Sequence, residues 1–211
     1  YAIDTRLPGM LFATVRRAPH GQALRAALTA EAAAMPGVEA VVPLPDGAAV
    51  VARSTWHAMR AADRIALELA PPPWPADTDG HRAAVDAAFD TDPETEYRDD
   101  GDVAAALADP GARVIEAAYE VPYLAHATME PMSAAARLRD GALEIWAGSQ
   151  VPVQAGDRAA AAGVEADRVT LHVPYLGGGF GRRGEPDFVE TAARVAAGVP
   201  GRPVLVTWSR E

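Results

Sequence analysis

The sequence predicts an α+β fold built from short strands and short helices. Short apolar or alternating runs, which are typical of strands, lie among alanine-rich runs flanked by helix-capping and helix-stopping residues. The stretch "PPPWPADTDG" (71–80) divides the chain into an earlier and a later unit, because four prolines favour an extended surface segment. The chain has 211 residues, of which 49% are hydrophobic and 23% charged, so it is long enough for one large or two small globular domains.

Charge and cysteine content exclude several classes of function. The net charge is −10, from 19 basic and 29 acidic residues, which argues against broad binding to nucleic acid or to an anionic membrane surface. There are no cysteines, so a disulfide framework, a thiolate zinc site and a protein-ligated iron–sulfur cluster are excluded within this chain. No apolar run approaches the roughly 20 residues of a membrane-spanning helix. We therefore expect neither a nucleic-acid-binding nor a transmembrane protein.

The first unit is predicted to mix strands and helices. A run rich in alanine and leucine predicts a helix or helical turn that stops at Pro36 and Gly37. Turn residues around Asp46 separate two apolar runs, and Ser54 is a typical helix cap. The expected elements are a strand at 10–17, a helix at 21–37, strands at 38–44 and 47–52, a helix at 54–65 and a strand at 66–70.

The later part of the chain begins with an acidic connection and continues as a second α+β unit. Asp140 and Gly141 predict a hairpin turn, and Pro186 and Gly198 predict the first position and the end of a helix. The expected elements are short helices at 81–89 and 103–108, strands at 113–123, 133–139 and 142–148, a helix at 151–164, a strand at 168–176, a helix at 186–198 and a strand at 203–208.

A glycine-rich loop joins the predicted strand at 168–176 to the predicted helix at 186–198, in "YLGGGFGRRGEPDF" (175–188). Residues 179–184 match G-x-G-x-x-G, the fingerprint of dinucleotide binding, and Ser209 and Arg210 after the next strand would suit a 2′-phosphate. In that fingerprint, however, the third glycine lies in the first turn of the helix, whereas here Pro186 follows it and belongs at the first helical position. The loop is therefore too long for a Rossmann turn, and no G-K-[ST] follows for a Walker A loop. A turn that only lets two elements pack closely remains an alternative.

Four motifs, one of them within the glycine loop, follow one another along the chain. They are "YLAHATMEPM" (123–132), "WAGSQ" (146–150), "LGGGFGRR" (176–183) and "GRPVLVTWSRE" (201–211). Together they closely resemble the molybdenum-cofactor-binding subunit of the xanthine dehydrogenase and aldehyde oxidase family. The double arginine and the "HATMEPM" form are most similar to the isoquinoline 1-oxidoreductase β-subunit branch. The segments "LPGMLFATVRRAPH", "MPGVEAVVPL" and "GAAVVARSTWHAMRAAD" resemble the α/β hammerhead domain that precedes the cofactor domain there.

The resemblance implies a domain layout. It implies a hammerhead domain at 1–75, a connecting segment at 76–111, and the start of a mixed α/β molybdopterin-binding domain at 112–211. The chain would then be a fragment of a large subunit. The family's catalytic glutamate lies beyond its end, so we expect this fragment alone to be inactive and to bind no cofactor.

The resemblance also implies which residues contact the cofactor. The glutamine of "WAGSQ", here Gln150, approaches the oxo ligand of the metal, and Gly179, Phe180 and Gly181 lie against the metal centre. Arg182 is a candidate for contacting the pterin phosphate. Salt bridges to neighbouring domains, or an exposed and solvated arginine pair with Arg183, remain alternatives. The molybdenum itself is held by the dithiolene of the pterin, so no side chain is expected to ligate it.

The family's chemistry gives the expected function. The full-length protein is expected to hydroxylate an N-heteroaromatic compound or an aldehyde, with water as the oxygen source. Its cofactor would be molybdenum–molybdopterin, plain or as the cytosine dinucleotide, and its partners would be the rest of the large subunit and a small subunit carrying [2Fe–2S] clusters. A cofactor-less scaffold of the same fold and an NADP-binding domain remain alternatives. The compartment stays open between the cytoplasm and export through a twin-arginine signal that the chain lacks.

Overall fold

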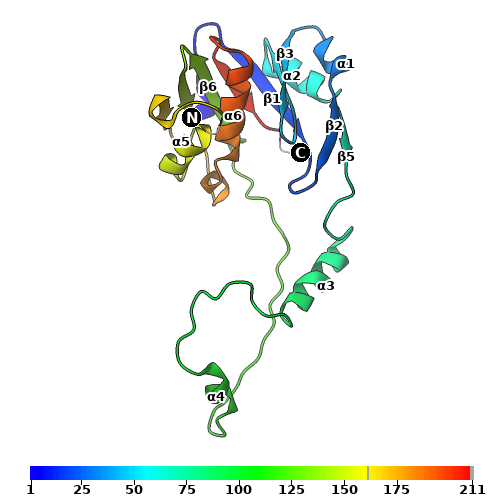
Figure 1. Cartoon of the computed structure of the whole chain (residues 1–211), viewed down its shortest axis with the longest axis vertical. Coiled ribbons are helices and arrows are strands. Elements are labelled where there is room, and N and C mark those ends of the chain that lie inside the picture. Colours follow the sequence, from blue (N-terminus) through cyan, green and yellow to red (C-terminus); the bar gives the residue numbers. More distant parts are fainter. Residues whose placement is uncertain (161, 210–211) are drawn as a thin grey trace. The chain divides into compact units, whose positions relative to one another are not determined.

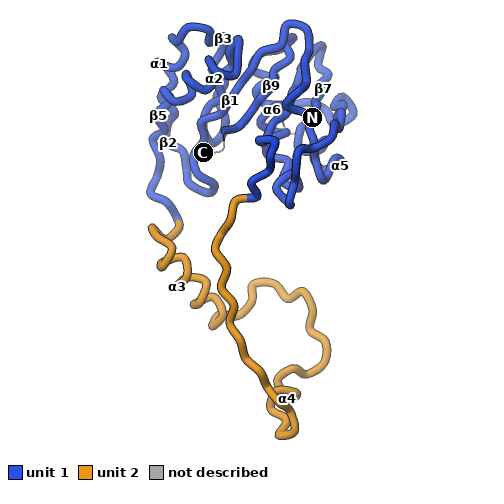
Figure 2. Tube along the Cα trace, turned by 180° about the vertical axis from the view of Figure 1, so that it is seen from behind, with its two compact units in different colours: residues 1–73, 126–211 blue, residues 74–125 orange. Residues whose placement is uncertain are grey.

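The computed structural model describes residues 1–160 and 162–209. Within that range the chain forms two compact units, one of residues 1–73 with 126–209 and one of residues 74–125 (Figure 2). The first unit contains a mixed seven-stranded sheet (Figure 1). Its strands, in spatial order, are β3 (Val38–Leu44), β4 (Gly47–Ala52), β1 (Leu11–Arg17), β9 (Val204–Thr207), β6 (Ser133–Arg139), β7 (Ala142–Trp146) and β8 (Val169–His172). The expected mixed α+β architecture is confirmed.

The two faces of this sheet are covered by different helices. Alternate residues of β4 divide between two cores, since Val51 belongs to the larger one and Val50 to the smaller one. In the larger core α6 (Asp187–Gly198) packs on β6 and β9, and α5 (Pro152–Ala160) packs on α6 and β8. In the smaller core α2 (Thr55–Ala62) packs on β1 and β4.

The sheet crosses the predicted domain boundary. β1 comes from the first 75 residues and β9 from the last hundred, yet the two are parallel neighbours, with Phe12 opposite Leu205. β9 in turn pairs antiparallel with β6, whose Ala135 lies opposite Leu205. Strands from both sides of the proline-rich stretch thus share one core. The assignment of residues 1–75 and 112–211 to separate domains stays a prediction.

Local signals in the sequence correctly placed most elements. The Ser54 side chain accepts a hydrogen bond from the backbone N–H of His57 at the start of α2, as a helix cap should. Asp140 and Gly141 have φ of 50° and 72°, the paired left-handed conformation of a two-residue hairpin, and they join β6 to β7. Pro186 precedes the first residue of α6, and Gly198 is its last residue.

Two predicted elements are wrong. A helix over 21–37 is not formed: the segment is β2 (Leu24–Leu28) followed by α1 (Ala30–Ala33), which is only the helical turn that the sequence also allowed. β2 pairs antiparallel with β5 (Ala66–Leu69) in a separate two-stranded sheet, and this tertiary pairing overrides the helix propensity of alanine and leucine. The expected strand at 113–123 has no regular secondary structure, because no other described strand pairs with it.

The second unit is an open segment with two short helices. They are α3 (Thr78–Ala88), capped by Asp77, and α4 (Val103–Ala108), capped by Asp102. Both were predicted from the sequence, and neither has a buried residue. The described residues of this unit therefore lack a hydrophobic core of their own. Across the described chain, no helix is both long and apolar enough to span a membrane.

Candidate functional site

The glycine loop follows β8 and reaches the start of α6 through strained backbone conformations. Gly178 and Gly181 have φ of 98° and 91°, a region that glycine enters without steric cost. Phe180 between them has φ of 52°, which is uncommon for a residue with a side chain and is a feature often found at functional sites. A 3₁₀ turn at Arg182–Gly184 then closes the loop, with the Arg182 N–H donating to the Gly179 carbonyl at 2.9 Å.

Two other glycines of the loop permit a close approach to neighbouring segments. A Cβ atom at Gly177 would lie 2.4 Å from Cβ of Glu130, and one at Gly179 would lie 2.6 Å from Oε1 of Gln150. Both distances are far inside van der Waals contact. The glycines therefore bring the loop against the end of β7 and against the segment that precedes β6.

Gln150 lies just after β7 and faces this loop. Its backbone N–H donates to the carbonyl of Arg183 at 3.1 Å, and its side-chain Oε1 accepts a hydrogen bond from the N–H of Gly181 at 3.1 Å. Because the Gly181 N–H can only donate, it fixes the orientation of the amide and turns the Nε2 donors away from this bond. Nε2 has no acceptor among the described residues, and the side chain is exposed. Gln150 is thus oriented as a hydrogen-bond donor.

Further unpaired donors lie beside that amide. The backbone N–H groups of residues 178–180 have no acceptor within the described part of the chain. Phe180 as a residue is 74% exposed. Main-chain N–H groups without an acceptor are able to donate to an electron-rich ligand atom. The loop therefore combines free N–H donors, one oriented amide and one exposed aromatic ring.

A buried ion pair fixes the loop from beneath. Nη2 of Arg183 lies 3.0 Å from Oε2 of Glu130, and both residues are buried. The same guanidinium donates to the carbonyls of Glu130 (3.0 Å) and Gly178 (2.8 Å). Burial lowers the pKa of Arg183 below its ordinary value, and the negative charge of Glu130 opposes that change. The alternative of an exposed, solvated arginine pair is wrong for Arg183.

Glu130 joins three distant segments. Its Oε2 also accepts the N–H of Gly177 at 2.8 Å, and its Oε1 accepts the N–H of Ile3 near the start of the chain at 3.1 Å. Sequence reasoning assigned Glu130 no role. The available signal was a charged residue between Met129 and Pro131 directly before a buried strand, a position where a carboxylate needs partners. Glu130 and Arg183 together hold the loop whose Gly181 N–H orients the side chain of Gln150.

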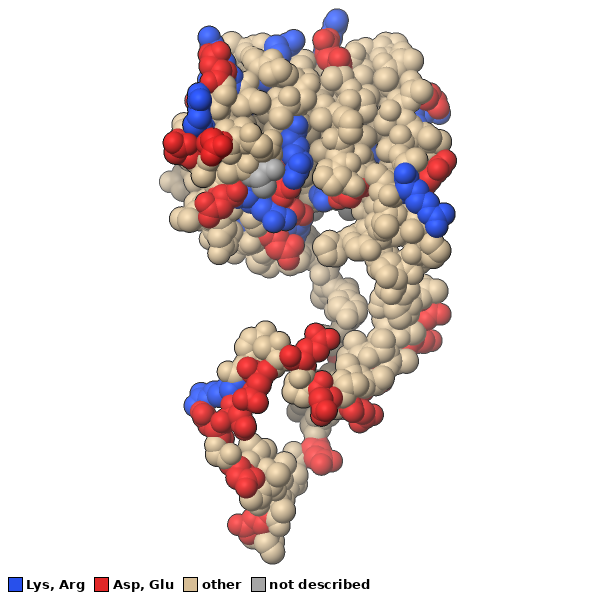
Figure 3. Space-filling model, in the orientation of Figure 1, with Lys and Arg blue, Asp and Glu red and all other residues tan. Residues whose placement is uncertain are grey.

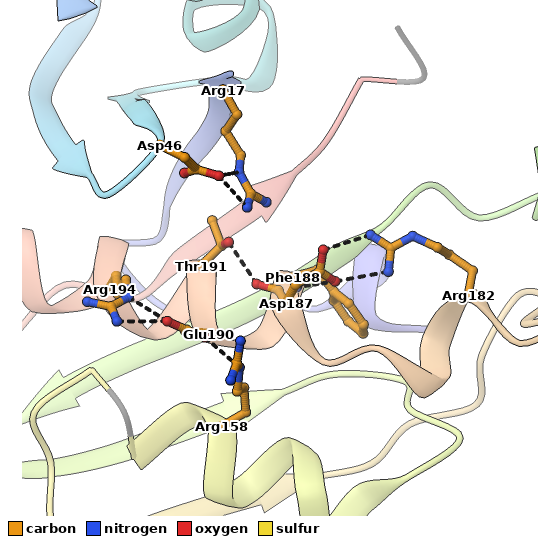
Figure 4. A network of polar contacts seen from close by, with 9 residues as sticks. All are labelled: Arg17, Asp46, Arg158, Arg182, Asp187, Phe188, Glu190, Thr191 and Arg194. Atoms are coloured by element: carbon orange, nitrogen blue, oxygen red, sulfur yellow. Dashed lines mark hydrogen bonds and ion pairs between the residues drawn. The ribbon is translucent and has the colours of Figure 1, made fainter. Parts of the chain in front are cut away.

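Arg182 points in another direction. Its guanidinium forms two 2.9 Å contacts with the carboxylate of Asp187 at the start of α6 (Figure 4). It also lies over the ring of Trp208, at 5.5 Å from the ring centre. Asp187 additionally accepts the N–H of Phe188. This bidentate pair holds Arg182 within its own unit, and its contact with the pterin phosphate stays a prediction.

An open cleft of about 670 Å³ lies at the far end of the loop. The Gly184–Asp187 turn lines it together with Arg17 and Arg158, and neither Gln150 nor Phe180 is among its lining residues. Of the five predicted site residues, the structure brings Gln150, Gly179, Phe180 and Gly181 together and turns the guanidinium of Arg182 away. None of residues 178–181 lines this cleft either, so it is separate from the oriented amide and the unpaired N–H groups.

The arrangement does not form a Rossmann site. β8 ends at His172 and α6 begins only at Asp187, so the fingerprint glycines lie outside the helix. The strand after α6 is β9, which pairs with β1 and β6 rather than with β8. Arg210, which would suit a 2′-phosphate, lies outside the residues that the structure describes. The expected mismatch with a dinucleotide fingerprint is confirmed.

The mixed sheet carries a glycine loop whose unpaired polar groups, among the described residues, are main-chain N–H donors, with one oriented amide beside them. The family described as "Molybdopterin cofactor-binding domain" matches residues 88–211. The chain belongs to this family. A similar curated protein is isoquinoline 1-oxidoreductase subunit beta of Brevundimonas diminuta, with 32% identity over 100% of this chain and 28% of that protein.

Solved structures share the fold. Quinoline 2-oxidoreductase from Pseudomonas putida 86 matches 100% of this chain and 32% of its own, with a TM-score of 0.73 and 22% identity. Aldehyde oxidoreductase from Desulfovibrio gigas matches 97% of this chain and 27% of its own, also with a TM-score of 0.73 and 22% identity. The chain thus spans less than a third of the length of these relatives.

Proposed function

We propose that this chain is the first part of the cofactor-binding large subunit of a molybdenum hydroxylase that oxidises an N-heteroaromatic compound or an aldehyde. The observation that carries the proposal is the side chain of Gln150. Its oxygen is occupied by the Gly181 N–H, so its Nε2 donors are free beside the unpaired N–H groups of residues 178–180. The membership in the molybdopterin-binding family and the similarity to isoquinoline 1-oxidoreductase support it.

The residues of the loop fit this cofactor. A molybdenum–dithiolene group carries oxo and sulfur atoms, which accept hydrogen bonds and need donors without negative charge nearby. A neutral amide and main-chain N–H groups are such donors. A Cβ at Gly181 would meet no described atom within 4 Å, so the space beside the loop is open to a ligand. When bound, the cofactor supplies a molybdenum centre that takes two electrons from the substrate carbon.

The residues of this chain would bind the cofactor, hold a hydrogen-bond donor in position for it and shield it from water. Nε2 of Gln150 donates to an electron-rich oxygen, and the Gly181 N–H holds the amide in that orientation before any ligand arrives. Phe180 of the loop is exposed, and with the cofactor bound its ring would supply an apolar wall that excludes water. The buried pair of Glu130 and Arg183 keeps the loop fixed, so little reorganisation is needed on binding.

The remaining functions belong to other parts of the protein. This chain has no cysteine, so [2Fe–2S] clusters that receive the electrons require another chain or segment, and we assign them to a small subunit. The general base is assigned to the part of the large subunit outside residues 1–211. We also assign the cytosine dinucleotide form of the cofactor, in keeping with the isoquinoline 1-oxidoreductase branch. The substrate class rests on the same similarity.

Metal and nucleotide analysis of the purified full-length enzyme tests the proposal. We expect about one molybdenum per large subunit, release of a cytosine nucleotide on acid hydrolysis, and dye reduction with quinoline or isoquinoline that incorporates oxygen from labelled water. A folded protein without molybdenum would contradict the proposal and favour a cofactor-less scaffold. Saturable binding of NADPH with no molybdenum would restore the dinucleotide alternative.

A further inference from the structure

Residues 113–123 combine a strand pattern with complete exposure. Every second residue is apolar from residue 115 onward, namely Ile115, Ala117, Tyr119, Val121 and Tyr123. The larger members of this run are 78% (Ile115), 92% (Tyr119), 82% (Val121) and 87% (Tyr123) exposed. The intervening residues are Glu116, Ala118, Glu120 and Pro122. Such alternation gives an extended segment one apolar and one polar face.

The backbone of this segment is equally unpartnered. Between residues 113 and 125 no main-chain N–H or C=O group bonds to another described residue. The segment is extended but has no neighbouring strand, so its apolar side chains and its backbone groups both face solvent. An exposed apolar strip of this kind typically marks an interaction site. The sequence prediction of a strand here thus lacks only a partner.

The charge of residues 74–125 indicates what kind of partner surface would be complementary to this unit. Residues 74–125 contain 13 acidic residues and three arginines, a net charge of −10 that equals the charge of the whole chain. The other residues are therefore neutral in sum. Figure 3 shows the acidic side chains gathered along this unit. A surface that accepts the unit is complementary if basic side chains border an apolar strip.

We propose that residues 115–123 form an edge β-strand by pairing with a sheet in the part of the large subunit outside this chain. Pro122 has no N–H to donate. In a strand, the backbone groups of residues 116, 118 and 120 point to the same edge as those of Pro122, so this edge is the one less suited to pairing. The hydrogen bonds therefore run through the N–H groups of residues 115, 117, 119, 121 and 123. The apolar face formed by the odd-numbered side chains packs on the core of that sheet, which is the usual mode of strand addition.

The length and the family of the chain indicate which part of the protein supplies the partner sheet. The molybdopterin-binding family match begins at residue 88, so this segment lies inside the cofactor-binding domain. The chain covers only 28% of the similar isoquinoline 1-oxidoreductase subunit, so most of such a subunit lies outside it. The inference rests on the proposed function only in that the chain is part of a longer subunit. It requires neither molybdenum nor activity.

Hydrogen exchange at single-residue resolution in the full-length holoenzyme tests the proposal. We expect the amides of residues 115, 117, 119, 121 and 123 to exchange about 100-fold more slowly than those of residues 116, 118 and 120. The acidic stretch 93–101 is the internal control and should exchange rapidly. Uniformly fast exchange along 115–123 would overturn the strand. Equal protection of odd and even amides would overturn the edge position.

A pair of adjacent alanines provides matched variants. Ala117 lies on the apolar face and Ala118 on the opposite one, and both are exposed in this chain. Ala117→Lys should abolish the odd-residue protection, because it places a charge between the strand and its sheet, whereas Ala118→Lys should leave protection within about threefold. Equal effects of the two substitutions would contradict a one-faced strand.

The source of the partner strand is decided by repeating the exchange measurement on the separated large subunit. Protection that persists there at all protein concentrations supports pairing within the subunit. Protection that is lost with the small subunit, or that appears only when sedimentation shows self-association, would assign the strand to the small subunit or to a second copy. Either result would overturn the proposal. Neither depends on bound molybdenum, so failure of the proposed function would be seen separately.

Discussion

Nη2 of Arg183 lies 3.0 Å from Oε2 of Glu130, at a point where neither residue is accessible to more than a trace of solvent. The same guanidinium bonds the carbonyl of Gly178, while the carbonyl of Arg183 accepts the backbone N–H of Gln150. One residue therefore joins the ion pair, the glycine loop and the oriented amide. Removing either charge would leave the other buried and unpaired.

Arg183→Ala is expected to destabilise the chain by about 3–5 kcal/mol, because it leaves the Glu130 carboxylate buried without its cation. Arg182→Ala is the matched control. Its side chain is 21% exposed and its partner Asp187 is 32% exposed, so we expect a loss of about 1 kcal/mol. Urea unfolding followed by circular dichroism measures both. Similar losses for the two variants would contradict the buried pair as the main support of the loop.

A double-mutant cycle separates the pair from the other bonds of each residue. Glu130→Ala also removes the acceptors of Ile3 and Gly177, so its own loss contains more than the ion pair. The double variant with Arg183→Ala should be less destabilised than the sum of the single variants, by about 0.5–3 kcal/mol. Strict additivity would mean that the two side chains act independently.

Gly177→Ala is expected to destabilise the loop, whereas Gly184→Ala is not. A methyl group at Gly177 would lie 2.4 Å from the buried Cβ of Glu130, which cannot move without disturbing the ion pair. At Gly184 the added Cβ meets no described atom within 4 Å and the backbone is not left-handed. We expect a difference of about 1–3 kcal/mol in the free energy of unfolding. Equal stabilities would show that the close approach of the loop is not required.

Gln150→Ala in the full-length enzyme should lower kcat by about 100-fold or more with molybdenum content unchanged, because it removes one oriented donor. Gln154→Ala is the control, since Gln154 is an exposed glutamine on α5 that lines the separate cleft. Steady-state kinetics with quinoline and metal analysis provide the readouts. Wild-type kcat for Gln150→Ala would remove this amide from the active site.

Gly181→Val should abolish turnover. Gly181 has φ of 91°, so a β-branched residue adds strain of about 1–3 kcal/mol. Its side chain would also project into the open space beside Gln150, where no described atom lies within 4 Å. We therefore expect turnover to be lost while the free energy of unfolding falls by only about 1–3 kcal/mol. If turnover and molybdenum content both stayed within a few-fold of wild type, the loop would serve only for packing.

Elements that depend on local chemistry were predictable from the amino-acid sequence. The Ser54 cap, the Asp140–Gly141 turn and the Pro186 start depend on bonds and dihedral angles within a few residues, so they were predicted correctly. The resemblance to the molybdenum hydroxylase family implied that Gln150 and the loop approach the same cofactor, and a 3.1 Å hydrogen bond joins Gln150 to Gly181.

Features that depend on a distant partner could not be predicted from local sequence and became visible in the folded chain. Residues 24–28 have the composition of a helix, yet β2 forms because β5 lies beside it, and the strand pattern at 113–123 remains unpaired where no such neighbour is present. The burial of Arg183 is of the same kind. Two adjacent arginines are identical in sequence terms, but one meets Asp187 near the surface and the other meets Glu130 in the interior. Burial and strand pairing are properties of contacts between segments far apart in the chain, which local residue patterns do not encode.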